Sequence, residues 1–118
     1  PQRTIVGYAK LLNNQEYIQA LNDNKPVVVG IEVFDSFHSL NSSSPIIQMP
    51  GSNQYSLGGH SVCLVGYSIP DSKFLAKNSF GQDWGDNGYF WIPFDYAATY
   101  IFEGWVFDIN NQKINYEV

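Results

Sequence analysis

The chain has 118 residues, enough for one domain but small for two. Hydrophobic residues make up 44% and charged residues only 14%, which excludes a disordered chain. Six Lys and Arg residues are scattered singly among eleven Asp and Glu, so no basic patch exists to bind nucleic acid. The apolar runs are too short to cross a membrane. Because the chain begins with Pro1, we expect it to be a processed or excised piece.

The first half of the chain predicts one helix and the strand that follows it. The side chain of Asn13 can accept a hydrogen bond from the first helical turn, and Glu16 follows at capping-box spacing. We therefore expect a helix over Asn14–Asn22. The run Val27–Val33 is β-branched and almost wholly apolar at its start, which predicts a strand buried on both faces. A short strand over Ile46–Met49 is also expected.

The second half of the chain predicts strands joined by turns. We expect strands over His60–Ser68, Lys73–Ser79, Tyr89–Pro93 and Tyr100–Ile109, a glycine-punctuated loop over Phe80–Gly88, and short helical turns over Phe34–Leu40 and Phe94–Thr99. One early helix packed on an antiparallel sheet is an α+β arrangement.

Two side chains of this half could form a catalytic pair. His60 can serve as base and acid near neutral pH. The amide oxygen of Asn78 can accept a ring N–H and so fix the tautomer of the histidine. Because an amide cannot take up a proton, this pair suits a nucleophile whose own anion balances the imidazolium. A cysteine thiolate meets that requirement.

The segments around these residues resemble the papain-like cysteine peptidases. GGHSVCLVGY is similar to the histidine strand of the family, and KNSFGQDWGDNGYFWI to its asparagine segment, usually written KNSWGxxWGxxGYxxI. EYIQALNDNKPVVVGIEV is similar to its helix leading into a proline-led strand. The resemblance covers most of the chain. It implies that residues 1–118 form the C-terminal half-domain of such a peptidase, the barrel-like right-hand half of the papain fold.

The resemblance also implies roles for single residues. His60 matches the catalytic histidine and Asn78 the asparagine that orients it. Phe80 stands where the family usually has a tryptophan, whose ring covers the His–Asn contact and borders the site for the leaving side of the substrate. Trp84 matches the second tryptophan of the motif.

Four further residues have expected roles that follow from the resemblance or from their position. Gly30 and Gly59 align with walls of the pocket for the second substrate residue before the cut, and two glycines would leave that pocket open on those sides. No motif surrounds His38, so we expect a surface or turn residue. Cys63 lies three positions after His60 in the same strand, which places the two side chains on opposite sides of the strand. We therefore expect an inert core cysteine.

The nucleophile is consequently expected outside this chain. In the family, the nucleophilic cysteine and the glutamine of the oxyanion hole precede the histidine, and nothing before His60 matches the cysteine motif. The resemblance implies hydrolysis of peptide bonds in peptide or protein substrates, with the cysteine supplied by an N-terminal half of the same enzyme. The chain alone is then expected to be inactive. No cofactor and no metal are implied, and the resemblance favours a secreted or lysosome-like compartment.

Two other interpretations stay open. The chain could be a non-catalytic module that binds peptides in a peptidase-like cleft, and the residues upstream of Pro1 in the full gene product would separate this from the half-enzyme. It could also be a complete small hydrolase that uses Cys63, which the strand geometry disfavours.

Overall fold

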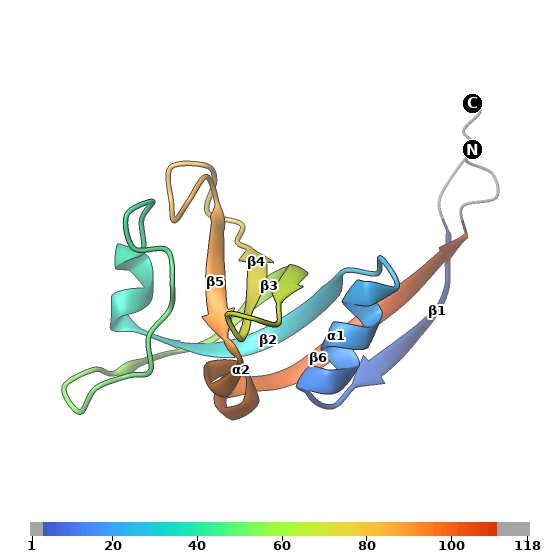
Figure 1. Ribbon diagram of the computed structural model, residues 1–118, viewed down its shortest axis with the longest axis horizontal. Helices are drawn as coiled ribbons and strands as arrows, with labels where there is room; N and C mark the ends of the chain where they lie inside the picture. The colour runs from blue at the N-terminus through green and yellow to red at the C-terminus, as the bar shows by residue number, and fades with distance from the viewer. Residues whose placement is uncertain (1–3, 111–118) are drawn as a thin grey trace.

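The computed structural model describes residues 4–110, which form a six-stranded antiparallel sheet with the strand order β1-β6-β2-β3-β4-β5 (Figure 1). The elements are β1 (Thr4–Leu11), α1 (Asn14–Asn22), β2 (Val27–Phe34), the 3-10 helix η1 (Asp35–Ser39), β3 (Ser56–Ser68), β4 (Lys73–Lys77), β5 (Tyr89–Pro93), α2 (Phe94–Tyr100) and β6 (Ile101–Asn110). Two helices on an open antiparallel sheet confirm the α+β class. None of the helices described is both long and apolar enough to cross a membrane.

The helix α1 begins and ends where its sequence predicts. The Asn13 side chain accepts a hydrogen bond from the backbone N–H of Glu16 at 3.0 Å, which satisfies one free amide of the first turn. The Glu16 carboxylate in turn accepts from the backbone N–H of Leu12 at 2.6 Å, one residue earlier than in the usual capping box. Tyr17 and Ala20 are the buried residues of the helix.

The strand β2 is buried on one face only, so the expectation of burial on both faces is wrong. Val27, Val29 and Ile31 are buried, whereas the side chain of Val28 between them is 38% exposed. Strands buried on both faces are typical of parallel sheets, in which helices cover each side. Here α1 and α2 both pack against the face of β2 that carries the buried residues. The opposite face of the sheet has no covering element within residues 4–110.

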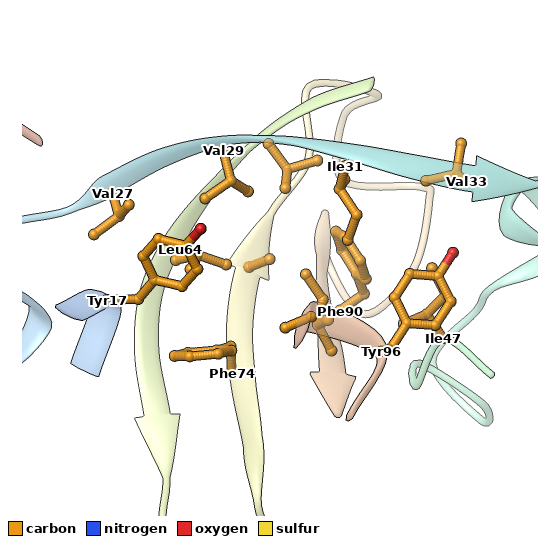
Figure 2. Close-up of a cluster of buried hydrophobic side chains, with 14 of the residues drawn as sticks. Tyr17, Val27, Val29, Ile31, Val33, Ile47, Leu64, Phe74, Phe90 and Tyr96 are labelled. Atoms are coloured by element: carbon orange, nitrogen blue, oxygen red, sulfur yellow. The ribbon is translucent and has the colours of Figure 1, made fainter. Parts of the chain in front are cut away.

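The core lies between the helices and this covered face. Figure 2 shows Tyr17 of α1 and Tyr96 of α2 on the same side of β2. The buried side chains drawn there include Tyr17, Val27, Val29, Ile31, Val33, Ile47, Leu64, Phe74, Phe90 and Tyr96. The one polar atom of Tyr96 is satisfied, because its hydroxyl donates to the backbone carbonyl of Glu32 at 2.8 Å.

The strand β1 was not predicted. It pairs only with β6, and these two strands form a long ribbon that extends away from β3, β4 and β5 (Figure 1). Between Gly7 and Leu11 every side chain is half-buried or exposed. An edge strand of this kind carries no apolar alternation, which is the signal that marks a half-buried strand in a sequence.

The other boundaries differ in detail. Ile46–Met49 is not a strand, because only an isolated bridge joins Ile46 to Trp91. The strand β4 ends at Lys77 rather than Ser79, and α2 is a helix of seven residues rather than one turn. The helical turn expected within Phe34–Leu40 is the 3-10 helix η1.

Candidate active site

His60 and Asn78 come from neighbouring strands. His60 lies on β3, and Asn78 follows the last residue of β4, which pairs with β3. The backbone N–H of Asn78 donates to the carbonyl of Gly88 at 2.9 Å, so the chain after β4 is held against the start of β5. The Asn78 side chain is only 4% exposed, the one polar residue among the fully buried residues described. Asn78 is therefore held both by the hydrogen bond of its backbone and by the burial of its side chain.

The expected contact between these two residues is present. Nε2 of His60 lies 2.7 Å from Oδ1 of Asn78, and Oδ1 also accepts the backbone N–H of Ser79 at 2.9 Å. Because a backbone N–H can only donate, the atom that receives it must be the amide oxygen. Nε2 therefore carries the hydrogen of the neutral ring, and Nδ1 is left as the acceptor. No hydrogen bond within residues 4–110 engages Nδ1, so this atom is available to take up a proton.

Aromatic rings surround the histidine. The buried Phe37 of η1 lies 5.4 Å from the His60 ring, and Phe80 lies 5.1 Å from it, both measured between centroids. The Phe80 side chain is 42% exposed, so this ring lies at the surface beside the histidine. Apolar rings of this kind exclude water from a hydrogen bond and strengthen it.

Trp84 is buried beneath the aromatic rings next to His60 and does not form a wall of the site. Its ring packs at 4.9 Å from Phe37 and 5.6 Å from Phe80, and it makes no ring contact with His60 among the described pairs. Its indole Nε1 and the amide Nδ2 of Asn78 are buried, and neither has a hydrogen-bond partner within the described part of the chain. Trp84 thus supports Phe80 and Phe37 from below.

The space over Gly30 and Gly59 is filled by one aromatic ring. A Cβ atom at Gly30 would lie 2.8 Å from the Phe102 ring, and one at Gly59 would lie 2.9 Å from it. The opening expected from two glycines is thus occupied by Phe102, whose side chain is 61% exposed. Glycine at both positions is what allows this ring to lie so close to the two strands. No local pattern in the sequence connects Phe102 with these glycines, and the inference from sequence missed it.

A shallow hollow remains beside this ring. It measures about 290 Å³ and is lined by Val28, Val29, Gly30, Gly59, His60, Ser61, Phe102, Glu103 and Trp105. Glu103 is the one carboxylate among the lining residues, and it has no salt bridge within residues 4–110. An unpaired carboxylate between aromatic rings favours a cationic group.

Cys63 lies on the uncovered face of the sheet. It pairs with Val28 of β2, whereas His60 pairs with the buried Ile31, so the two side chains point to opposite faces, as predicted. The side chain is half-buried there and is not part of the core, which corrects the expectation of a core cysteine. Burial raises the pKa of the Cys63 thiol, and the nearby Lys77 opposes this shift.

His38 is a surface residue of η1, and its ring also contacts the aromatic rings next to His60. Its ring stacks on Phe80 with a centroid distance of 5.5 Å and an angle of 17°. The expectation of a surface residue is confirmed by its exposure, but the stacking was missed. Within the described residues, no group of three or more His, Cys, Asp or Glu side chains is placed to hold a metal ion.

The sequence of this chain matches a known protein family and several known proteins. The family model described as papain family cysteine protease matches residues 2–104. An uncharacterised peptidase C1-like protein of Acanthamoeba polyphaga mimivirus is 44% identical over 81 residues, which are 68% of this chain and 26% of that protein. Cysteine proteinase 2 of Entamoeba histolytica is 34% identical over 88 residues, 72% of this chain and 28% of that protein. The chain therefore spans about a quarter of the length of these relatives.

Solved structures share the fold. Xylellain, a cysteine protease from Xylella fastidiosa, superposes with a TM-score of 0.77 at 28% sequence identity, over 88% of this chain and 40% of that one. Procathepsin B from Trypanosoma congolense gives a TM-score of 0.74 at 19% identity, over 93% of this chain and 38% of that one. The second likeness concerns the fold alone.

Proposed function

Because the chain belongs to the papain family of cysteine proteases, we propose that it is the histidine-bearing and asparagine-bearing half of a peptidase that hydrolyses peptide bonds. The nucleophilic cysteine then comes from an N-terminal part of the same protein or from a separate chain. The substrate is a peptide or protein. The observation that carries the proposal is the 2.7 Å contact between Nε2 of His60 and Oδ1 of Asn78.

The contact between His60 and Asn78 supports the following sequence of proton transfers. With Nε2–H held by Asn78, Nδ1 of His60 accepts the thiol proton, and the thiolate attacks the carbonyl carbon of the scissile bond. The peptide C–N bond then breaks as the imidazolium protonates the leaving amine, which leaves a thioester. In the second half-reaction His60 takes a proton from water, the resulting hydroxide attacks the thioester, and the returned proton restores the thiol. Asn78 keeps the ring in one orientation throughout and exchanges no proton.

Cys63 does not fit the part of nucleophile. Residues three apart in one strand point to opposite faces and are separated by about 10 Å along the chain. The thiol also lies where burial raises its pKa, which disfavours the thiolate. A catalytic cysteine instead needs a position within reach of Nδ1 of His60. These points support a nucleophile supplied from outside the 118 residues.

The uncovered face of the sheet supports a missing partner. On this face lie four exposed hydrophobic residues, Tyr8, Val28, Phe102 and Phe107, with Trp105 between them. Isolated domains rarely expose contiguous apolar surface beyond a few hundred Å². The hollow beside Phe102, over Gly30 and Gly59, lies on this face, whereas the His60 side chain points to the other side of β3. We propose that the cysteine-bearing half covers this face and that its cysteine also reaches the side of β3 on which the His60 ring lies.

The test is peptidase activity in the full gene product that contains this chain, compared with the 118-residue chain alone. We expect thiol-dependent cleavage of fluorogenic peptides by the full product and none by the chain. His60→Ala should abolish cleavage, whereas Cys63→Ser should preserve it as the matched control. Cleavage by the chain alone that vanishes in Cys63→Ser would overturn the proposal.

The same measurements distinguish a half-enzyme from the alternative function, a non-catalytic binding module. A non-catalytic binding module predicts a full product that binds peptides but does not cleave them at any pH. A covalent thiol-reactive peptide probe should then label no upstream cysteine. Labelling of one upstream cysteine that depends on His60 would exclude the binding module.

A further inference from the structure

We propose that His38 is a positioning residue that holds the ring of Phe80 against His60. The role concerns the shielding of the His60–Asn78 hydrogen bond. It rests on the proposed function only for its effect on catalysis, because the shielding itself can be measured in the chain alone. Neither the family motif nor the local sequence assigns a role to His38.

The ring of Phe80 contacts two histidine rings. The centroid of His60 lies 5.1 Å from that of Phe80, and the centroid of Phe80 lies 5.5 Å from that of His38. The outer pair is nearly parallel, at 17°, which is the offset-stacked geometry that aromatic rings prefer. Phe80 is therefore in contact with both histidine rings.

The 3-10 helix η1 holds Phe80 from two directions. Phe37 and His38 are neighbours on this helix. Phe37 is buried and lies 6.0 Å from Phe80 below, whereas His38 is exposed and stacks from outside. Because Phe80 contacts both of these residues, its ring cannot swing away from His60 without losing the His38 stack.

Phe80 needs such support because it belongs to a loop. It follows β4 and precedes Gly81, whose φ of +91° only glycine adopts readily. Its side chain is 42% exposed, so burial alone does not fix its rotamer. Phenylalanine also presents less area than the tryptophan usual at this position of the motif. His38 restores part of the missing aromatic contact.

The stack does not depend on the charge of His38. A neutral imidazole stacks as an aromatic ring, and an imidazolium over the face of Phe80 is attracted to the electron-rich ring face. The positioning role therefore depends on the ring of His38 and not on its charge. This distinguishes it from a proton-transfer role, which one protonation state would abolish.

The experiment measures the Nε2–H hydrogen of His60 by nuclear magnetic resonance in the 118-residue chain. His38→Ala should accelerate exchange of this hydrogen with solvent by about two- to tenfold, the range that loss of one aromatic pair predicts. It should also weaken the cross-relaxation between the Phe80 and His60 rings. His38→Phe keeps a flat ring and should restore both signals.

Two controls make the result specific. Tyr55→Ala removes an exposed ring that has no described aromatic partner, and should leave the exchange rate unchanged. Thermal unfolding of His38→Ala should still be cooperative, with no more loss of stability than one exposed aromatic pair contributes. In the Phe80→Trp background the larger ring covers the contact by itself, so His38→Ala should have a smaller effect than in the parent.

The results for His38→Ala test the positioning role independently of whether the full product is a peptidase. Unchanged exchange and cross-relaxation in a folded His38→Ala would overturn the positioning role whatever the activity of the full product. Failure of His38→Phe to restore them would overturn it as well. Protected Nε2–H that depends on His38, in a full product that cleaves no peptide, would support this inference and reject the peptidase.

Discussion

Oδ1 of Asn78 accepts two hydrogens, one from Nε2 of His60 at 2.7 Å and one from the backbone N–H of Ser79 at 2.9 Å. The second bond fixes the amide so that its oxygen, and not its nitrogen, faces the ring. The tautomer of His60 thus follows from a backbone hydrogen bond on the asparagine itself. A single residue sets both the orientation and the protonation site of the histidine.

Asn78→Ala should therefore impair catalysis without removing the histidine. The ring of His60 loses the acceptor that selects Nε2–H, and we expect activity of the full product to fall by about 10²-fold, the lower end of the general acid–base contribution. The measurement is kcat/KM on a fluorogenic peptide. Asn78→Gln is the matched comparison, since it keeps the amide but shifts the oxygen. Equal activity in Asn78→Ala and the parent would contradict the orienting role.

A part of the fold or site can be predicted when its sequence pattern is formed by residues that are close together in the chain. The start of helix α1 is set by Asn13 and Glu16, which are three residues apart in the sequence. His60 and Asn78 each sit in a contiguous motif, so their pairing could be inferred from the resemblance alone. The strand β1 carries no such signal, because as an edge strand it has no buried face within Gly7 to Leu11.

The residues that were missed depend on distant parts of the chain. Phe102 lies on β6 and covers glycines on β2 and β3, a placement fixed by strand order. His38 stacks on Phe80, which is far from it in the chain and reaches it only because η1 and the loop after β4 meet in the fold. In both cases composition is uninformative, because an exposed aromatic or histidine looks the same in any loop.

The Phe102 ring should shift when a methyl group is added beneath it. Gly30→Ala places a Cβ atom 2.8 Å from the ring, a contact that only movement of Phe102 can relieve. We expect a loss of unfolding free energy of about 1 kcal/mol, typical of overpacking against a movable side chain. Urea denaturation measures it. In Phe102→Ala the same Gly30→Ala change should cost less, and additive effects would argue against the contact.

Glu103 should select basic side chains. It is the one carboxylate lining the hollow beside His60, next to the aromatic rings of Phe102 and Trp105. If a substrate side chain enters this hollow, peptides with Arg at that position should be cleaved by the full product in preference to peptides with Leu. Glu103→Gln should reduce the preference by roughly tenfold, the effect of a charge-assisted hydrogen bond of about 1.5 kcal/mol. An unchanged ratio of kcat/KM values would exclude Glu103 from specificity.

The Cys63 thiol should contribute to the loss of stability at alkaline pH. Burial raises its pKa in the folded chain, with Lys77 opposing, so the folded state holds this proton more tightly than the unfolded state. The associated stability is fully present below the unfolded thiol pKa and is lost as pH rises through the folded pKa. Cys63→Ala should therefore show a shallower decline of unfolding free energy above about pH 8.5. The remaining decline is expected from Tyr17 and Tyr96, because burial raises the pKa of both phenols. Identical slopes for Cys63→Ala and the parent would refute the assignment.

Cys63 also reports whether the uncovered face of the sheet binds the other half of the enzyme. It pairs with the exposed Val28 on that face and is half-buried in the chain alone. We expect the cysteine-bearing half to cover it, so alkylation of Cys63 should slow by at least tenfold in the full product, since reactivity requires an accessible thiolate. Mass spectrometry of peptides gives the rate.

A cysteine introduced at the exposed Ser42 by Ser42→Cys serves as the internal control, because it lies in the loop after η1 and should react at the same rate in both forms. Equal protection of both cysteines would indicate a general loss of reagent access. Unchanged reactivity of Cys63, with the introduced cysteine still reactive, would mean that the second half lies elsewhere. The apolar residues Tyr8, Val28 and Phe107 would then require a different partner, and the proposal that the cysteine-bearing half covers this face would have to be abandoned.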